Sequence, residues 1–495
     1  MSVFDEFIKN EGNSFPGKTY EEELLVPVFN DQKIYLFDVM FDIHRAHVIM
    51  LAEQNIIQIE AAKKMLAGIN KVAALDKDTF TYQPEFEDLF FLVEAKISEE
   101  IGADLAGNIH IGRSRNDMGI AMYRLVLRKY LLDFLKESYR LSEILLTQAQ
   151  QHARTYITGF THTQPAQPTT LGHYFLAIYD VLQRDINRMW ASYATVNQSP
   201  MGAAALTTTG FPINRQRMCE LLGFDKIIEN SYDCIGGADY LLDASTAIMT
   251  CMVNTGRWIQ DFLRYVTREA GYFKVADTYV QVSSIMPQKR NPVSIEHSRS
   301  LASSAYGDAL AAINMIHNTP FGDIVDTEDD LQPHLYRAFE KANRVMKLMY
   351  AVIATLEVDK EMTMKMARKS SITITELADT LTREHHVSFR KAHTIASHIA
   401  QKTSEEKKEL YDWAVSEINA MIPIDHVSLS EEEWKKIISP EHFVEIRSRQ
   451  GGPNPLEVTK MIQDRKQQLD AQLKEYEKTV DELNCRRSKL LAYTF

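Results

Sequence analysis

The sequence contains few cysteines for its length of 495 residues. The four that occur are Cys219, Cys234, Cys251 and Cys485. Their wide spacing gives neither a CxxC pair nor the framework of bridges that stabilises small secreted domains. We therefore expect a protein of a reducing compartment, the cytoplasm.

Long hydrophobic runs are missing as well. No window of 18 apolar residues occurs, so no membrane-spanning helix is expected. The opening residues, MSVFDEFIKN, lack the basic segment and apolar run of a secretory signal. The formal net charge is −12 and no basic stripe is present, so a nucleic-acid partner is not expected either.

Proline is absent from two long stretches, between Pro212 and Pro287 and between Pro333 and Pro423. Long helices need such proline-free runs. In the first stretch, apolar side chains recur at spacings of three, four and seven, which predicts one apolar helix face. These side chains are Ile248, Cys251, Met252, Ile259, Phe262, Leu263 and Val266.

Two further segments have the character of long helices. Residues 122–149 are rich in leucine and contain no glycine or proline, and apolar residues recur at the same spacings over 462–483. Alternating strand-like runs are scarce. We therefore predict an all-α protein whose long amphipathic helices pack in a central bundle or against other chains.

Three polar stretches without helical or strand period lie between the helical segments. They are HIGRSRNDMG (110–119), FTHTQPAQPTTLGHY (160–174) and QVSSIMPQKRNP (281–292). Their separation along the chain suggests a composite site built from segments that are distant in sequence.

The side chains of these stretches bind anions and can move protons. Arg113, Arg115 and Asn116 offer donors suited to carboxylates. The other polar groups are Thr161, His162, Gln164, Ser283, Ser284, Lys289 and Asn291. Taken singly, each has an ordinary alternative as a solvated pair, a structural histidine or a simple turn, and Met286 is expected to be a packing residue. The stretches contain no tight metal-ligand cluster, glycine-rich phosphate cradle or G-x-S-x-G elbow.

Taken together, the residue patterns of these stretches resemble those of a known family. SSIMPQKRNPVSIE (283–296) is similar to the pattern S-S-x-M-P-x-K-x-N-x-x-x-x-E of the aspartase/fumarase superfamily. Four further segments resemble its argininosuccinate lyase branch. These are GRSRND (112–117), THTQPAQP (161–168), ELADTLTREHHVSFRKAH (376–393) and GGPNP (451–455). The resemblance runs from about Asp38 to Val458.

The resemblance implies a three-region helical lyase. The regions would be an N-terminal helical region (1–112), a central helical bundle (113–365) and a C-terminal helical region (366–495). Four subunits would pair their bundles into a homotetramer with a multi-helix core. Each active site would take its segments from three subunits.

The resemblance also implies a reaction, the elimination of fumarate from an N-substituted aspartate. In this branch 2-(N-omega-L-arginino)succinate gives L-arginine and fumarate, a step of arginine biosynthesis. Ser283 would take the proton from Cβ, with its alkoxide stabilised by Lys289 and loop amides. Lys289 and Asn291 would then hold the dianion that forms. No metal or organic cofactor is implied.

The remaining roles follow from the same resemblance. Thr161, Ser114 and Asn116 would bind the succinyl carboxylates. Arg115, Gln164 and Ser284 are further substrate-binding candidates. His162 would be the family's histidine with Glu296 as its orienting carboxylate. Whether His162 protonates the leaving nitrogen or organises the site is open at this point.

The sequence departs from the branch in its N-terminal third and in the catalytic loop. No W-G-G-R-F segment precedes Asp38. Phe90 follows Glu87 and Asp88 where the branch has a histidine. Val282 stands where the family loop has glycine, and a β-branched residue there would restrict a hinge.

A last departure concerns the leaving group. Asp323, Glu328 and Leu331 stand where the branch has tyrosine, glutamine and lysine contacting the arginine portion. Two carboxylates suit a cationic amine; alternatively, this loop is shifted and the carboxylates face solvent. The alternatives to argininosuccinate cleavage are a lyase for another N-substituted aspartate, such as ethylenediamine disuccinate, and an inactive crystallin-like homologue.

Overall fold

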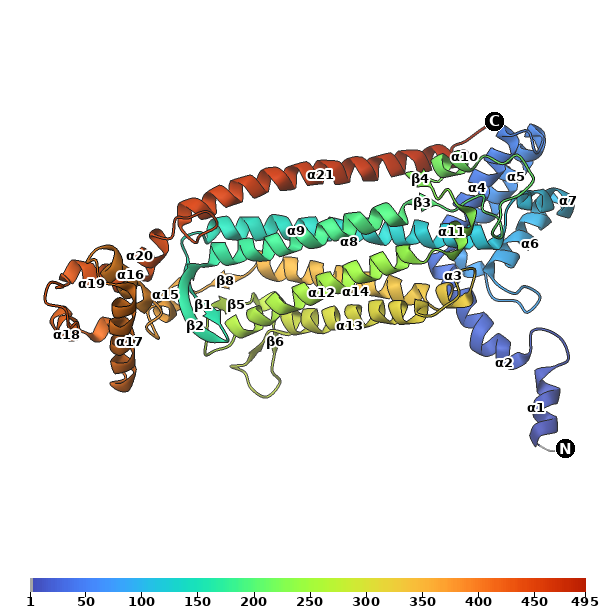
Figure 1. Cartoon of the computed structure of the whole chain (residues 1–495). Helices are drawn as coiled ribbons and strands as arrows, with labels where there is room; N and C mark the ends of the chain where they lie inside the picture. Colours follow the sequence, from blue (N-terminus) through green and yellow to red (C-terminus); the bar gives the residue numbers. More distant parts are fainter. Residues whose placement is uncertain (1–2) are drawn as a thin grey trace.

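Five long helices form the centre of the molecule (Figure 1). The computed structural model describes residues 3–495. The five helices pack in a ring in the order α8, α9, α12, α13, α14 and back to α8. Their bounds are α8 Arg115–Gln151, α9 Leu171–Val196, α12 Asp239–Tyr265, α13 Val293–Ile316 and α14 Gln332–Ala354. The predicted all-α fold with a central long-helix bundle is confirmed.

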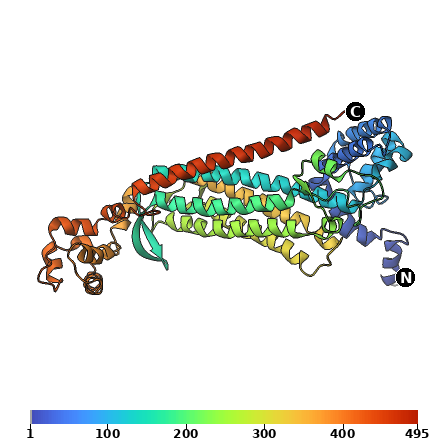
Figure 2. The same ribbon diagram turned by 45° about the horizontal axis from the view of Figure 1, so that its top comes forward.

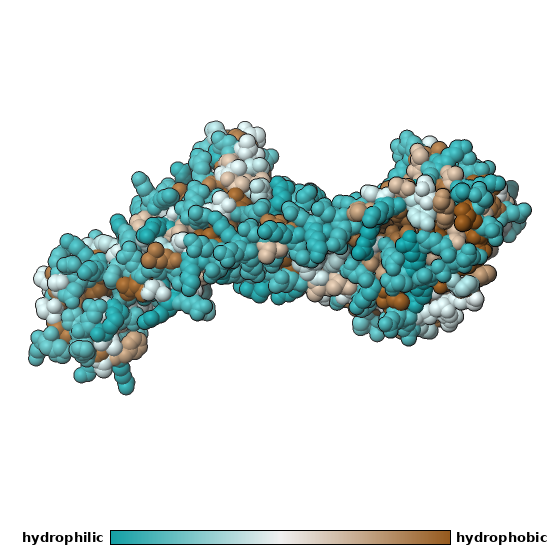
Figure 3. All heavy atoms as spheres, turned by 90° about the horizontal axis from the view of Figure 1, so that it is seen from above, coloured by the Kyte–Doolittle hydropathy of each residue, from teal (hydrophilic) through white to brown (hydrophobic). Residues whose placement is uncertain are grey.

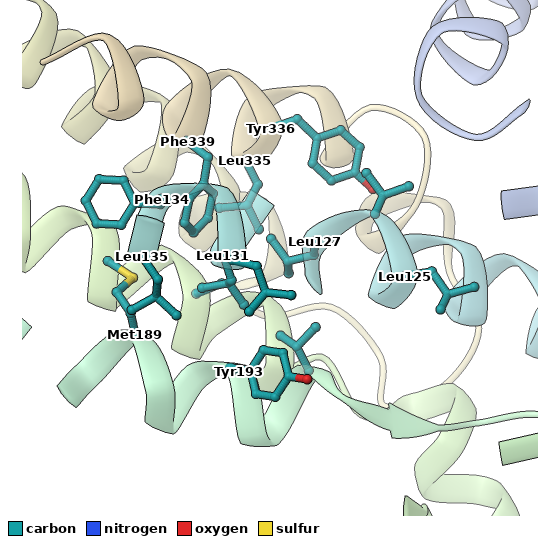
Figure 4. Close-up of a cluster of buried hydrophobic side chains, with 14 of the residues drawn as sticks. Leu125, Leu127, Leu131, Phe134, Leu135, Met189, Tyr193, Leu335, Tyr336 and Phe339 are labelled. Atoms are coloured by element: carbon teal, nitrogen blue, oxygen red, sulfur yellow. The ribbon is translucent and has the colours of Figure 1, made fainter. Parts of the chain in front are cut away.

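Helix α8 is the longest member of the ring and lies between α9 and α14. A capping box starts it, because Ser114 and Asp117 satisfy each other's backbone N–H groups. Its apolar side chains interleave with those of both neighbours, and Figure 4 shows this core. The labelled residues are Leu125, Leu127, Leu131, Phe134 and Leu135 from α8, Met189 and Tyr193 from α9, and Leu335, Tyr336 and Phe339 from α14.

The N-terminal helices cover one end of the bundle (Figure 1, right). They are α1 Val3–Glu11, α2 Lys18–Tyr20, α3 Val26–Tyr35, α4 Phe37–Glu53, α5 Ile59–Ala73, α6 Leu89–Ile101 and α7 Ala103–Gly107. Helix α4 is buried along most of its length and packs on α5, α8 and α21. The short helices α10 Arg215–Leu221 and α11 Ser231–Gly236 lie at the same end.

The opposite end carries a small helical unit with its own core. Its helices are α15 Lys360–Ala367, α16 Ile374–Arg383, α17 Phe389–Glu405, α18 Val415–Ala420, α19 Glu431–Ile438 and α20 Pro440–Glu445. Residues 377–438 contribute a separate hydrophobic cluster there. The last helix, α21 Pro455–Leu491, instead returns along α8 and α9 towards α4 (Figure 2). The predicted limits of the three regions stay predictions.

The strands are short and form four two-stranded pairs among the described residues. They are β1 Tyr156–Thr161 with β2 Gln164–Thr170, β3 Gln198–Ser199 with β4 Lys226–Ile227, β5 Phe273–Lys274 with β8 Glu357–Val358, and β6 Gln281–Val282 with β7 Arg290–Asn291. Two of the stretches that show no period in sequence are therefore hairpins. Hydrophilic side chains dominate the face seen in Figure 3. Within residues 3–495, no helix is both long and apolar enough to span a membrane.

Candidate active site

The predicted site residues gather at the two ends of the bundle. Ser114, Arg115 and Asn116 lie at the start of α8, whereas Thr161 and His162 follow its end. Helix α8 has 37 residues, and at 1.5 Å per residue it separates these groups by about 55 Å. Helix α13 likewise places the loop before Val293 and the loop after Ile316 at opposite ends. One chain therefore holds two incomplete halves of the predicted site.

The first half contains the hairpin β6–β7, which projects from the side of the bundle (Figure 1). The Ser283 Oγ accepts the backbone N–H of Met286 at 3.0 Å and that of Ile285 at 3.3 Å. Two amide donors on one hydroxyl oxygen would stabilise negative charge on it. The stabilisation of a Ser283 alkoxide by loop amides stays a prediction.

The ends of this loop are held by main-chain and ionic contacts. Val282 pairs with Arg290 in the hairpin, where extended backbone suits a β-branched residue. Arg290 also pairs with Asp277 and donates to the Val275 carbonyl at 2.8 Å. The Lys289 and Ser284 side chains are exposed, and Asn291 is half-buried.

Met286 does not pack as the sequence analysis expected. Its side chain is 42% exposed, and that of Ile285 is 86% exposed. The hairpin projects from the bundle, so it offers these side chains no core to enter.

A second hairpin, β1–β2, carries Thr161, His162 and Gln164. His162 and Thr163 form its two-residue turn, and both have positive φ angles, of 50° and 64°. Such angles are costly for residues with a side chain and persist where the surroundings enforce them. Arg264 braces the turn by lying 4.0 Å over the Phe160 ring. All three predicted side chains are exposed at the tip.

No hydrogen bond or ion pair joins this tip to the Ser283 loop within the described chain. Glu296 lies exposed in the first turn of α13, and no contact links it to His162. Its role as the orienting carboxylate of His162 stays a prediction, which one chain alone does not test.

The second half of the site begins at the N-terminus of α8. Ser114 caps the helix, and its hydroxyl donates to the Asn116 Oδ1 at 2.8 Å. The Asp117 carboxylate accepts the N–H groups of Ser114, Gly202 and Ala204 at 2.9–3.0 Å. Burial nevertheless raises the pKa of Asp117 to about 6. The helix dipole favours an anion beside Asn116, although the Ser114 hydroxyl already accepts the Asn116 N–H at 3.3 Å.

Arg115 and Arg113 have different surroundings. Arg115 pairs with Asp88, lies 3.7 Å from the Glu87 carboxylate and sits 4.9 Å over the Phe91 ring. The side chain of Arg113 is only 1% exposed and donates to the His44 Nδ1 at 3.2 Å. Arg113 is therefore a buried structural residue, whereas Arg115 is accessible.

A pocket of about 240 Å³ connects Arg115 and Asn116 with the loop after α13. Asp323 and Glu328 both line it; Glu328 is half-buried, whereas Asp323 is exposed. Burial, and then the hydrogen-bonded Asp323 carboxyl group, raise the pKa of Glu328 to about 7. Leu331 is fully buried and belongs to the core instead.

Comparison with known proteins decides the family. Residues 25–307 match the lyase family and residues 371–445 match the argininosuccinate lyase C-terminal family. "Argininosuccinate lyase 2" of Agrobacterium fabrum is 40% identical over 452 residues, which cover 90% of each chain. "Argininosuccinate lyase" of Methanocaldococcus jannaschii is 34% identical, with 94% of each chain covered. The chain belongs to the argininosuccinate lyase family.

The solved structures agree with this assignment. A crystal structure of EDDS lyase in complex with formate superposes with a TM-score of 0.85 at 28% identity, covering 98% of this chain and 97% of the other. The protein is thus a carbon–nitrogen lyase of the aspartase/fumarase superfamily. Within residues 3–495, no group of three or more His, Cys, Asp or Glu side chains is placed to hold a metal ion.

Sequence reasoning missed four side chains that line the same pocket of this lyase. They are Gln32 from α3, Asp88 before α6, Tyr123 from α8 and Asp329 beside Glu328. The Gln32 amide donates to the Asp329 Oδ1 at 3.2 Å. Asp88 and Asp329 are close in sequence to Phe90 and Glu328, which the comparison with the branch had pointed out. This proximity in sequence was the one signal that could have placed them in the pocket. Nothing in the sequence distinguishes Gln32 or Tyr123.

Proposed function

We propose that this lyase eliminates fumarate from an N-substituted aspartate, with 2-(N-omega-L-arginino)succinate as the first substrate and L-arginine as the other product. The relatives named argininosuccinate lyase support this substrate. The observation that carries the elimination is the pair of backbone N–H groups on the Ser283 Oγ. They prepare that oxygen to act as a base.

The reaction begins with a weakly acidic hydrogen beside a carboxylate. Ser283 takes the Cβ proton, and the electrons of the C–H bond move onto the adjacent carboxylate as an aci-carboxylate dianion. Lys289 and Asn291 stabilise this charge, since preset donors at developing charge are usually the largest catalytic contribution. The C–N bond then breaks, the Cα–Cβ double bond forms, and the nitrogen leaves with the electron pair and gains a proton.

The remaining residues bind and orient the substrate. Ser114, Asn116 and Thr161 hold the succinyl carboxylates, and Arg115, Gln164 and Ser284 complete the binding set. His162, with Glu296 as its partner, organises the site near the leaving nitrogen.

The active enzyme is a homotetramer that works in the cytoplasm. The separation of the two half-sites by the length of α8 supports this assembly. Pairing of bundles brings the start of α8 in one subunit to the Ser283 and His162 segments of others, which completes each site.

A second candidate is a lyase for another N-substituted aspartate. The structural similarity to EDDS lyase and the carboxylates Asp323 and Glu328 favour it. An inactive crystallin-like role is less well supported, because the loop amides still hold the Ser283 Oγ.

The test mixes the purified full-length protein with argininosuccinate and follows fumarate by ultraviolet absorbance, with arginine confirmed by mass spectrometry. Robust release of both products supports the proposal. If argininosuccinate gives none, fumarate is supplied with a panel of amines. An adduct would then identify the second candidate, and no reaction with any amine would overturn the elimination itself.

A further inference from the structure

The pocket beside Arg115 carries an excess of negative charge. Four carboxylates line it and only one cation does, namely Arg115. The carboxylates are Asp88, Asp323, Glu328 and Asp329. They come from two separate segments, the turn before α6 and the loop after α13, so the pocket is acidic on two sides.

The single cation is already neutralised. Arg115 pairs with Asp88 inside the pocket, and the Glu87 carboxylate lies 3.7 Å away on its other side. Asp88 is only 5% exposed, whereas the Arg115 side chain is 44% exposed, so water reaches the guanidinium group but hardly reaches the carboxylate. Because Asp88 and Glu87 already balance its charge, Arg115 provides no net positive charge for a carboxylate of the leaving group.

The carboxylates on the other side lack such compensation. Glu328 is half-buried, and its hydrogen-bonded neighbour is another carboxyl group, that of Asp323. Asp329 has a neutral partner, the Gln32 amide. A cation that enters beside two neighbouring carboxyl groups favours their charged forms, so any proton they hold is lost to solvent. An entering carboxylate would be repelled by these like charges.

A tyrosine also lines this space. Tyr123 lines the pocket, is 6% exposed, and makes no hydrogen bond within the described residues. A phenol hydroxyl can donate or accept a hydrogen bond, so Tyr123 adds a polar group to the lining. The hydroxyl lies close enough to Glu328 and Asp329 for their charges to act on it.

We infer that this pocket binds the far end of the leaving group as a cation that carries no carboxylate. The inference rests on the proposed function and narrows its substrate class. The preferred substrates are N-substituted aspartates whose leaving group is a guanidine or amine ending in an ammonium group. Asp323 and Glu328 pair with the ammonium, and Tyr123 supplies a hydrogen-bonding oxygen.

The matched pair of test substrates differs by one carboxylate. One is argininosuccinate, and the other is the same compound made with agmatine, which is arginine without its α-carboxylate. The scissile C–N bond and the succinyl part are identical in both. We expect kcat/KM to favour the agmatine compound by about tenfold or more, since like charge in a partly dry pocket is costly.

Binding is measured separately from turnover. The Ser283→Ala protein is titrated calorimetrically with each compound, so that affinity is read without chemistry. The double variant Asp323→Asn/Glu328→Gln should lose the preference, and Tyr123→Phe should weaken binding of the agmatine compound. Asp326→Asn is the control, because Asp326 is exposed on the same loop but does not line the pocket.

Equal or tighter binding of argininosuccinate would overturn the inference, as would an unchanged preference in the double variant. Absence of fumarate from both compounds would instead overturn the proposed function. The binding ratio would still decide what the pocket prefers.

Discussion

The Ser283 Oγ accepts the backbone N–H of Met286 at 3.0 Å, three residues further along the same loop. The Ile285 N–H adds a second bond at 3.3 Å. A serine hydroxyl is a weak base unless its alkoxide is stabilised, and two fixed dipoles supply part of that stabilisation. In the proposed mechanism, the loop therefore prepares this oxygen before any substrate arrives.

Replacement of this oxygen tests its role directly. We expect Ser283→Ala to lower kcat by about a thousandfold or more, because a positioned base contributes on this scale. Fumarate release measures the loss, while calorimetry and light scattering should show unchanged ligand binding and assembly. Ser300→Ala on the exposed face of α13 is the matched control and should remain active. Substantial turnover by Ser283→Ala would remove Ser283 from the role of base.

The proposed sharing of each active site between subunits predicts complementation between inactive proteins. His162→Ala and Ser283→Ala tetramers should each be inactive. Mixed tetramers made by dissociating and reassembling the two should recover part of the activity, because some sites then collect only intact segments. Native mass spectrometry verifies mixing. Verified mixed tetramers without activity would show that each site draws both residues from one chain.

Glu328 predicts how affinity for a cationic leaving group depends on pH. Burial and Asp323 raise its pKa to about 7, Asp329 adds to this, and Arg115 opposes it. The ionised form binds a cation, so KM should fall as pH rises through 7. Below the pKa, KM should increase by up to about tenfold for each pH unit. Rate measurements on the agmatine compound test this, and a pH dependence retained in Glu328→Gln would assign it to another group.

The pairing of Asp88 with Arg115 makes a further prediction about specificity. Asp88→Asn keeps an N-cap oxygen for the Phe91 N–H of α6 but removes the charge that neutralises Arg115. We expect the ratio of kcat/KM values to move several-fold towards the carboxylate-bearing argininosuccinate. Circular dichroism should show intact helices, and Glu99→Gln on the exposed face of α6 is the control. A constant ratio would mean that Arg115 does not sense the leaving group.

Much of the fold could be predicted from the sequence, because long helices have a strong period. The stripe from Ile248 to Val266 lies in α12 or directly after it, and residues 122–149 lie within α8. The hairpin β1–β2 escaped prediction for a local reason. Its turn is His162–Thr163 rather than an Asn-Gly pair, and Pro165 and Pro168 interrupt the strand pattern.

The acidic pocket was only partly predictable. Asp323 and Glu328 stood out by comparison with the branch, whereas Tyr123 and Gln32 look like ordinary residues of amphipathic helices. Their convergence depends on how α3 and α8 pack, which no local pattern records. The pairing of Arg115 with Asp88 is tertiary in the same way.

The length of α8 has a kinetic consequence. If the proposed assembly is correct, a newly made chain, whose predicted catalytic groups lie at opposite ends of one helix, has no activity until it meets other copies. The appearance of activity after dilution from denaturant would then follow a power of protein concentration rather than the folding rate of one chain. At low protein concentration the delay before activity appears would lengthen. Association of subunits, rather than folding of each chain, would then control when the enzyme becomes active.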